Sequence, residues 1–270
     1  MTRLTALVLA GTRAGGDPLA EYAGVSHKAL IEVGGRTMVE RVVEALAAAP
    51  EIERIVVAIE RPELLAGLAG LEPPRCAKPL GTMPTEPGGP SATVAAALRA
   101  LGVPLLVTTA DNALLETAWL GEFLAAIPAE ADLAAALARR DAVEAAAPDT
   151  RRTWLRFADG DYSGCNLFLL RRPAAAGAIA FWQTLERERK RPLRMVRRLG
   201  WTFAARYVLG RLSLAAAATR LGELGGGARF AVVSLSDGRA AIDVDKADDL
   251  DLVRRLVAAA PRAPTLPRRT

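Results

Sequence analysis

An apolar run that stops abruptly at a cluster of glycines is the strongest constraint on what this chain can form. Residues 4–10 read LTALVLA, and the next six residues, GTRAGG, contain three glycines. A continuous apolar run of this length is typical of a buried strand in an α/β protein. Glycines directly after the strand let backbone N–H groups approach a phosphate chain closely. Arg13 and Lys28 add positive charge on either side of the loop, so the pattern favours binding of a nucleoside triphosphate.

Segments with strand and helix character alternate along the rest of the chain. We expect strands at residues 4–10, 52–59, 103–109, 131–138 and 229–234, with a β-excursion over 154–170. We expect helices at residues 37–48, 93–101, 117–127, 173–191, 201–221 and 246–259. The Pro- and Gly-rich residues 72–91 are expected to form a loop, with Ser91 as a helix N-cap.

This alternation predicts an α/β fold with three α/β/α layers around a mostly parallel, mixed sheet. Residues 1–260 are expected to form one domain, with an inserted helical lobe at about 173–225. The basic tail at residues 261–270 is expected to be disordered. Ligands of such sheets bind at the carboxyl ends of the strands, so the loops that follow the strands are the candidate site.

Cysteine and histidine usage excludes several kinds of site. Cys76 and Cys165 form no CxxC motif, so neither a zinc site nor a disulfide framework is expected. His27 is the only histidine, which excludes catalysis by a histidine pair, and we expect it to be a loop residue without a catalytic role. No signal peptide and no apolar run of about 18 residues is visible. The expected location is the cytoplasm, with peripheral membrane contact left open.

Positive charge is concentrated in one segment. Residues 186–211 carry nine Lys and Arg against two Glu, whereas the whole chain has a net charge of +5. The remainder is therefore slightly acidic, which argues against a general nucleic-acid binder. Three interpretations of residues 186–212 stay open. Helices could pack over an acceptor site with arginines outward, the segment could contact anionic lipid or a lipid-linked substrate, or it could mediate self-association.

Five stretches resemble the nucleotidyltransferases with a glycosyltransferase-A-type fold. They are LVLAGTRAGGDPLA, KALIEVGGRTMVERVVEAL, GGPSATVAAAL, LLVTTADNALL and AIDVDKADDLDLV, in the order expected for the family. That superfamily includes sugar-phosphate nucleotidylyltransferases, molybdenum-cofactor guanylyltransferases and cytidylyltransferases. Thr12 stands where a second glycine is common, and Ala29 replaces the usual proline after the lysine. These departures indicate a peripheral subfamily.

The resemblance implies roles for particular residues. Arg13 would hold the leaving β- and γ-phosphates, and Lys28 would bridge the α-phosphate and the attacking phosphate. The acceptor side would include Gly164 and Asn166. The implied nucleotide-side residues are Leu9, Ala10, Gly11, Thr12, Gly89 and Ser91.

The resemblance also implies a Mg²⁺ site. Mg²⁺ prefers hard oxygen ligands. Asp111, at the end of a predicted strand, and Asp243 form the expected ligand pair. Asp245 is the second choice, because we expect its side chain to point away from the site.

These features predict an Mg²⁺-dependent nucleotidyltransferase. It would join an NTP, with CTP or UTP slightly favoured, to a phosphorylated sugar or alcohol and release pyrophosphate. The alternatives are a molybdopterin guanylyl or cytidylyl transferase and a non-catalytic nucleotide-binding protein of the same fold. A glycosyltransferase is disfavoured because no D-x-D motif surrounds Asp111.

Each of these residues also has an ordinary structural interpretation. Lys28 could be a solvated loop lysine, and Asp111 could belong to a simple turn. Asp243 and Asp245 could cap the last helix, where acidic residues favour the helix dipole.

Overall fold

The computed structural model describes residues 3–12, 16–188 and 191–259. Its centre is an eight-stranded sheet with the order β10-β7-β9-β6-β1-β4-β5, to which β8 is added on β9. The strands are β1 (Leu4–Leu9), β4 (Ile52–Ala58), β5 (Leu80–Met83), β6 (Leu105–Thr109), β7 (Leu133–Arg139), β8 (Leu155–Phe157), β9 (Gly160–Leu170) and β10 (Phe230–Leu235). A separate two-stranded sheet pairs β2 (Glu32–Val33) with β3 (Arg36–Thr37).

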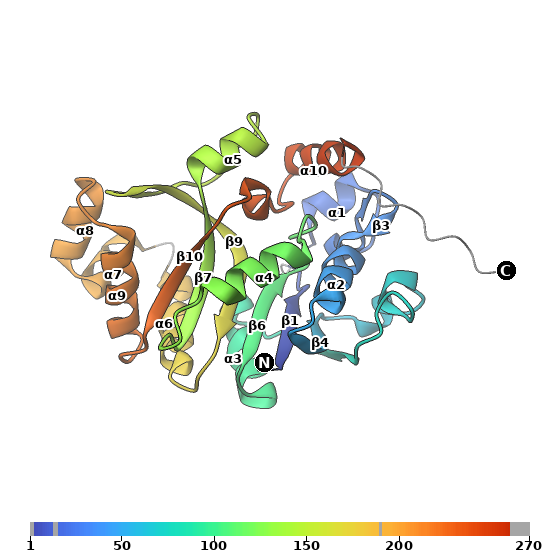
Figure 1. Cartoon of the computed structure of the whole chain (residues 1–270), viewed down its shortest axis with the longest axis horizontal. Coiled ribbons are helices and arrows are strands. Elements are labelled where there is room, and N and C mark those ends of the chain that lie inside the picture. Colours follow the sequence, from blue (N-terminus) through green and yellow to red (C-terminus); the bar gives the residue numbers. More distant parts are fainter. Residues whose placement is uncertain (1–2, 13–15, 189–190, 260–270) are drawn as a thin grey trace.

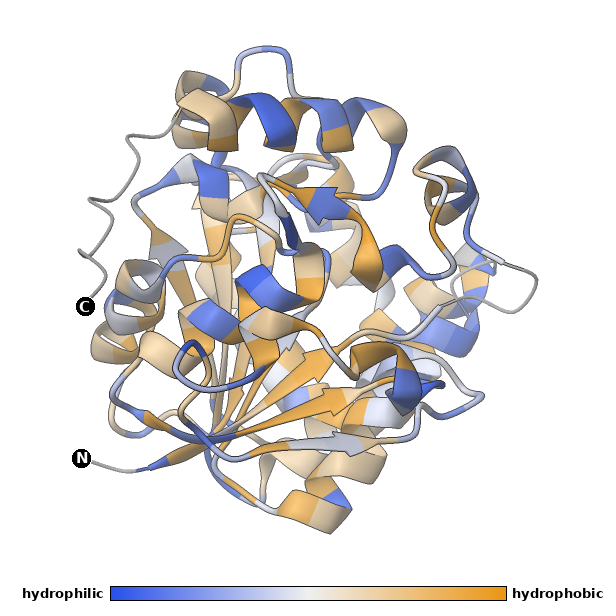
Figure 2. Cartoon of the chain, turned by 90° about the vertical axis from the view of Figure 1, so that its right-hand side faces the viewer, coloured by the Kyte–Doolittle hydropathy of each residue, from blue (hydrophilic) through white to orange (hydrophobic). Residues whose placement is uncertain are grey.

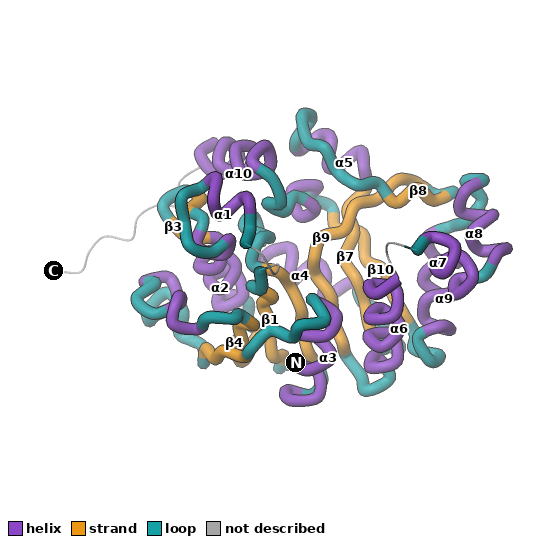
Figure 3. Tube along the Cα trace, turned by 180° about the vertical axis from the view of Figure 1, so that it is seen from behind, coloured by secondary structure: helices purple, strands orange, loops and turns teal. Residues whose placement is uncertain are grey.

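Helices cover both faces of this sheet (Figure 1). They are α1 (Pro18–Tyr22), α2 (Met38–Ala48), α3 (Pro90–Leu101), α4 (Thr117–Ala126), α5 (Arg140–Ala146), α6 (Ala175–Glu188), α7 (Pro192–Leu199), α8 (Trp201–Val208), α9 (Leu214–Leu224) and α10 (Ala247–Ala259). Short 3₁₀ turns are η1 (Lys28–Leu30), η2 (Pro62–Leu65), η3 (Ala69–Leu71) and η4 (Gly238–Ala241). Helices α2 and α4 lie on one face, and the reverse view in Figure 3 shows α3 and α6 on the other.

Strand β1 shows why the first apolar run is continuous. It pairs in parallel with β4 on one side and with β6 on the other. Ala6 and Val8 pack into the larger hydrophobic cluster with α2 and α4, whereas Leu7 packs into the second cluster with α3 and α6. Because both faces are covered, five of the six positions of the strand are apolar, and Thr5 is the exception. The strands are accordingly hydrophobic along much of their length in Figure 2.

Strand β9 makes the sheet mixed. It runs antiparallel to β6 and β7, between which it lies, whereas the neighbours of β1 and the β7–β10 pair are parallel. The three-layer, mostly parallel α/β fold expected from the sequence is therefore confirmed.

Some local expectations are wrong for identifiable reasons. The loop at 72–91 contains the edge strand β5, and α3 begins at Pro90 with Gly89 as its N-cap. Ser91 is therefore not the cap. Proline favours the first helical position, so the helix starts before the apolar periodicity becomes visible. The helix expected at 201–221 is divided into α8 and α9, and the short helices α5 and α7 were not expected.

Helices α6 to α9 fill the chain between β9 and β10. Helix α6 packs on the sheet beside α3, and α9 packs against both α6 and β10. The backbone approach between α6 and the end of α9 is close, because a Cβ at Gly177 would lie 2.2 Å from the carbonyl oxygen of Gly225. Glycine is therefore required at this crossing.

Glycine-to-alanine substitutions should have opposite effects in two of these helices. Gly177→Ala should lower the free energy of unfolding by about 1–3 kcal/mol, because the added methyl group overpacks the α6–α9 crossing. Gly121→Ala in α4 is the matched control, since its Cβ would meet nothing within 4 Å. There alanine should raise stability by up to about 1 kcal/mol. Urea unfolding of both variants checks this pair, and equal effects would contradict the assigned crossing.

Candidate active site

The loops after β1 and β6 meet at one edge of the sheet. The N–H of Ala10 donates to the carbonyl of Ala58, and the N–H of Ala110 donates to the carbonyl of Leu9, each at 2.9 Å. These bonds continue the parallel pairing one residue beyond the strands. Gly11 and Asp111 are therefore held side by side at the carboxyl ends of the strands, where ligands of such sheets bind.

Lys28 lies at the centre of the polar groups at this edge. Its Nζ donates to Asp111 Oδ2 at 2.7 Å and to Asp245 Oδ1 at 3.0 Å. Burial by itself would lower the pKa of Lys28, but the charges and hydrogen bonds of Asp111 and Asp245 outweigh it and raise the pKa to about 12. Lys28 is consequently a permanent cation at neutral pH, and it is not a solvated loop residue.

The 3₁₀ turn η1 positions this lysine through His27. The buried imidazole accepts the N–H of Ala29 at its Nδ1, at 3.1 Å. Its Nε2 lies 3.3 Å from Glu60 Oε2 and therefore carries the proton in the neutral ring. The sequence indicated no catalytic role for His27, and its observed role is to fix the backbone that carries Lys28.

Asp243 is held by two donors from distant segments. Asn166 Nδ2 donates to Asp243 Oδ2 at 2.8 Å, and Arg152 donates to the other carboxylate oxygen and, at 2.9 Å, to the Asp243 carbonyl. The Arg152 side chain, only 8% exposed, also pairs with Asp249 at 3.0 Å. Burial and the charge of the nearby Asp111 raise the pKa of Asp243, while Arg152 opposes that rise.

Asp245 does not point away from the site, so that expectation is wrong. In an extended segment, residues two apart share a face, and Val244 between the two aspartates takes the other face, where it is completely buried. The N–H of Val244 donates to the carbonyl of Asp111 at 3.1 Å. This bond joins the segment of residues 243–245 directly to the loop after β6.

The carboxylates fit a Mg²⁺ ion that has few protein ligands. Asp111 Oδ1 is buried and has no hydrogen-bond partner in the described part of the chain. Burial raises the pKa of Asp243 most, and the like charge of Asp111, which a cation would compensate, raises it further. Within the described residues, no three His, Cys, Asp or Glu are grouped to form a metal site. Mg²⁺ bound to nucleotides typically uses one or two carboxylates together with phosphate oxygens and water, which this arrangement can supply.

Glu60, which the sequence analysis did not identify, contacts the glycine-rich loop. Its Oε1 accepts the N–H of Thr12 at 2.5 Å and the Thr12 hydroxyl at 3.2 Å. Burial alone would raise the pKa of Glu60, but hydrogen bonds from its own backbone, Thr12 and His27 lower it. Arg13, the expected phosphate ligand, lies outside the described residues.

The expected nucleobase side is formed by the start of α3. Gly89 has a φ of +91°, and a Cβ there would lie 2.7 Å from Glu186 Oε1. The Glu186 carboxylate, at the end of α6, accepts the N–H of Ser91 at 3.2 Å. Ser91 itself is buried, and its hydroxyl has no partner in the described residues. No sequence motif pointed to Glu186, because a single Glu in a charged helix carries no signal.

On the expected acceptor side, β9 contains a bulge. Its register against β7 shifts between Ala135 and Leu137, opposite residues 164–168. Asn166 adopts a φ of +48°, which is uncommon outside glycine, and this conformation directs its amide to Asp243. Gly164 pairs with Leu137 beside the bulge. The bulge therefore brings the expected acceptor residues to the same edge as the aspartates.

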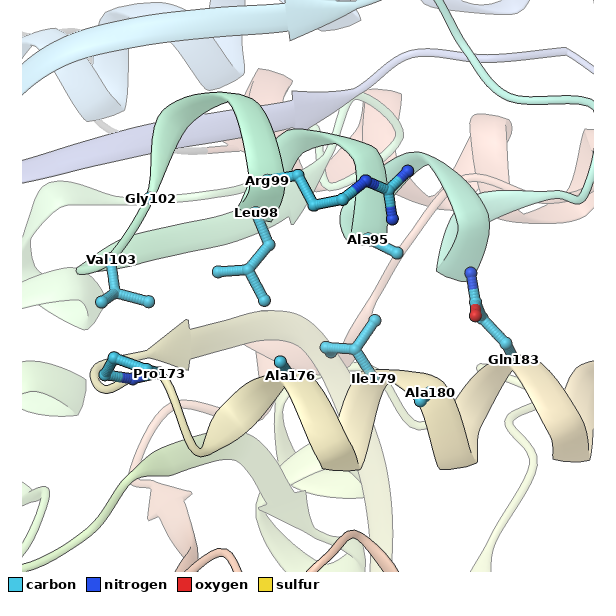
Figure 4. Close-up of a pocket in the computed structure, with 10 residues that line it drawn as sticks. All are labelled: Ala95, Leu98, Arg99, Gly102, Val103, Pro173, Ala176, Ile179, Ala180 and Gln183. Carbon is cyan, nitrogen blue, oxygen red and sulfur yellow. The ribbon is translucent and has the colours of Figure 1, made fainter.

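A pocket of about 430 Å³ lies elsewhere, between α3 and α6 (Figure 4). Leu98 and Val103 face Ile179 and Pro173 across it, and Arg99 and Gln183 lie at one end. None of the predicted site residues lines this pocket. The polar edge of the sheet is the better candidate site, since it holds the ionisable groups that phosphate chemistry requires.

Comparison with known proteins identifies the family of the chain. The family model of the MobA-like NTP transferase domain matches residues 6–229. The chain belongs to this family. Its expected resemblance to the nucleotidyltransferases is thereby confirmed. A comparison with curated protein sequences gives no match.

Solved structures extend the comparison. A hypothetical transferase from Thermus thermophilus is 34% identical with a TM-score of 0.77, and the match covers 92% of this chain and 100% of that one. More distant matches show the shared fold. The 4-diphosphocytidyl-2C-methyl-D-erythritol synthase of Anaerococcus prevotii is 11% identical over 95% and 99% of the two chains, with a TM-score of 0.58. A nucleotidyl transferase from Methanothermobacter is 17% identical over 95% and 98%, with a TM-score of 0.55.

The ion pairs of Lys28 should be visible in its titration. Asp111→Asn should lower the pKa of Lys28 from about 12 toward or below the ordinary 10.5, because burial then outweighs the remaining charge of Asp245. Asp245→Asn is the control with a smaller effect, since Asp245 is 57% exposed. NMR of ¹³C-labelled lysines in metal-free buffer measures this directly, because the chain has only four lysines. An unshifted Lys28 resonance in Asp111→Asn would contradict the pairing.

Proposed function

We propose that this protein is a nucleotidyltransferase that joins an NTP to a phosphorylated sugar or alcohol and releases pyrophosphate. The observation that carries the proposal is the Lys28 ammonium, held 2.7 Å from Asp111 beside the glycine-rich loop. Membership of an NTP transferase family supports the same chemistry. CTP or UTP is slightly favoured over the other nucleotides, on the basis of the GPSATV stretch at the start of α3.

In this reaction the main obstacle is repulsion between two anions. A phosphate oxygen of the acceptor attacks the α-phosphorus of the NTP and forms a new P–O bond. The bond from the α-phosphorus to the bridging oxygen breaks, and its electron pair leaves with pyrophosphate. No proton has to move, so the protein contributes positioning and charge compensation.

The residues of the site have matching roles. Lys28 would donate to the α-phosphate and the attacking phosphate, where negative charge accumulates. The backbone N–H groups of Gly11 and Thr12 would hold phosphate oxygens, together with Arg13. Asn166 and Arg152 would keep the carboxylate of Asp243 in place.

Asp111 and Asp243 would hold a Mg²⁺ ion bound with the nucleotide. The ion would neutralise phosphate charge and favour departure of pyrophosphate. The buried, unpartnered Oδ1 of Asp111 supports this assignment. Both oxygens of Asp243 already accept hydrogen bonds but keep a free lone pair each.

A pterin acceptor is the second candidate, because the matching family model is described as MobA-like. The two candidates differ in the acceptor and not in the nucleotide half of the site. An acceptor panel that includes molybdopterin separates them.

Pyrophosphate release is the direct test of the proposed reaction. We expect release with one NTP in the presence of Mg²⁺ and one phosphorylated sugar or polyol, and none when EDTA removes the metal. The four common NTPs are each tested against the acceptor panel. Turnover of a pterin alone would replace the favoured acceptor class, and no pyrophosphate with any pair would refute the reaction.

Removal of a single charge from the site should strongly slow turnover of the NTP and acceptor that prove active in this assay. Lys28→Ala and Asp111→Ala should each reduce turnover by at least about 100-fold, as expected when an electrostatic element of the transition state is lost. Asp248→Ala is a matched carboxylate control, because Asp248 is exposed in the first turn of α10. A near-normal rate in either site variant would remove that residue from the mechanism.

A further inference from the structure

Large apolar side chains on the surface are concentrated in α7, α8 and the turn after α8. Among the described residues, seven large hydrophobic side chains are exposed, and five of them lie between residues 193 and 209. These five are Leu193, Trp201, Tyr207, Val208 and Leu209, with exposed fractions of 73%, 66%, 37%, 83% and 65%. Large apolar side chains exposed together in one segment are typical of an interaction site. We refer to residues 191–211 as the α7–α8 face.

The same segment is strongly basic. Residues 191–211 contain six arginines and no acidic residue. Within the described part of the chain, only Arg198 has an acidic partner, Glu188 at 2.7 Å. This pairing lowers the pKa of Glu188, and the nearby charges of Arg194 and Arg191 lower it further. One carboxylate cannot balance six arginines, so the segment keeps a net positive charge beside the exposed apolar side chains.

Contacts on the inner side of α7 and α8, including those of Tyr207, hold these helices in place. The Tyr207 hydroxyl accepts the N–H of Arg156 at 3.4 Å, and its ring packs edge-on against Phe157, with 5.9 Å between centroids. Arg220 of α9 donates to the carbonyl of Leu199 at 3.2 Å. Helix α8 nevertheless buries no residue. The inner side of the α7–α8 face is therefore anchored to the rest of the protein, while Trp201 and Val208 on this face remain exposed to solvent.

The α7–α8 face also lies at one extremity of the molecule. Helix α8 is at the left end of the long axis in Figure 1 and at the right end in the reverse view of Figure 3. A flat surface can therefore approach the face without meeting the sheet or α10. No helix in the described residues is long and apolar enough to span a bilayer, so any membrane contact through this face would be peripheral.

We propose that the α7–α8 face binds the surface of membranes that contain anionic lipid. Arginine charge complements the anionic lipid head groups, and each arginine near such a surface increases the partition constant onto the membrane about fivefold. A large apolar side chain that becomes fully buried adds about tenfold. Tryptophan and tyrosine are the side chains best suited to the membrane–water interface. This inference does not depend on the proposed reaction.

Two other occupants fit the face less well. A symmetric dimer would place the same patch of each chain against the other, and its arginines would then face like charges. Single-stranded nucleic acid would be attracted by the arginines and could stack bases on Trp201 and Tyr207. However, the exposed aliphatic side chains Leu193, Val208 and Leu209 offer no ring for stacking. Both occupants are outcomes of the test.

The experiment compares binding of the full chain to two kinds of vesicle. We expect at least about tenfold stronger cosedimentation with vesicles containing about 40% phosphatidylglycerol than with phosphatidylcholine alone. About 0.5 M salt should remove most of this preference, because it screens the charges. The tryptophan emission should shift to the blue on binding, and Trp201→Ser should remove this shift although the other three tryptophans remain.

Two double variants separate the apolar contribution to vesicle binding from the contribution of charge. Trp201→Ser with Leu209→Ser, and Arg194→Glu with Arg197→Glu, should each weaken binding by about tenfold or more. The controls are Tyr22→Ser in α1, where the tyrosine is 60% exposed, and the exposed pair Arg54→Glu with Arg255→Glu. The controls should bind as the unmodified chain does. Thermal unfolding establishes that all variants remain folded.

Several results would overturn the inference. Equal binding to both kinds of vesicle, or unchanged binding of both double variants, would exclude an anionic-membrane face. Sedimentation velocity could instead show a dimer that Trp201→Ser with Leu209→Ser disrupts, which would assign the face to a second copy of this chain. Stronger binding to a single-stranded RNA that displaces the vesicles would assign it to nucleic acid.

Discussion

The ammonium group of Lys28 is the interaction on which the arrangement of the candidate site depends. It joins a carboxylate 83 residues away and another 217 residues away to the turn that follows the glycine-rich loop. Without a cation at this point, Asp111, Asp243 and Asp245 would repel one another in a partly buried setting. The site can therefore keep three acidic groups together only while Lys28 or another cation compensates their charge.

The sequence was informative about the fold because the strands are buried on both faces. Continuous apolar runs such as residues 4–10 have few other solutions in a chain of this length, and the helices between them follow from their periodicity. Strand β5 was missed because its sequence, LGTM, contains a glycine and little apolar character, and it lies at the sheet edge. Its position is set by pairing with β4, which local sequence does not encode.

Only those residues of the candidate site that lie in family motifs could be predicted from the sequence. Lys28 and Asp111 lie in such motifs, and the structure brings them into contact. Arg152 and Glu186 do not, since their importance comes from the tertiary contacts of a loop and of a helix end. Asp245 was misplaced for a different reason. In an extended segment only neighbouring residues alternate between faces, so the burial of Val244 on one face leaves Asp243 and Asp245 together on the other.

Carboxylates occupy two of the places where a nucleotide would approach the backbone. Glu60 accepts the N–H of Thr12 in the glycine-rich loop, and Glu186 accepts the N–H of Ser91 at the start of α3. Backbone donors at helix starts and tight loops need partners, and these side chains provide them. An anionic phosphate chain beside Glu60 would meet a like charge, so its binding requires Glu60 to move or to be neutralised. Because Glu60 also contacts His27, such a movement would remove a contact of the turn that positions Lys28. One side chain, Glu60, thus links the proposed phosphate loop to the turn that carries Lys28.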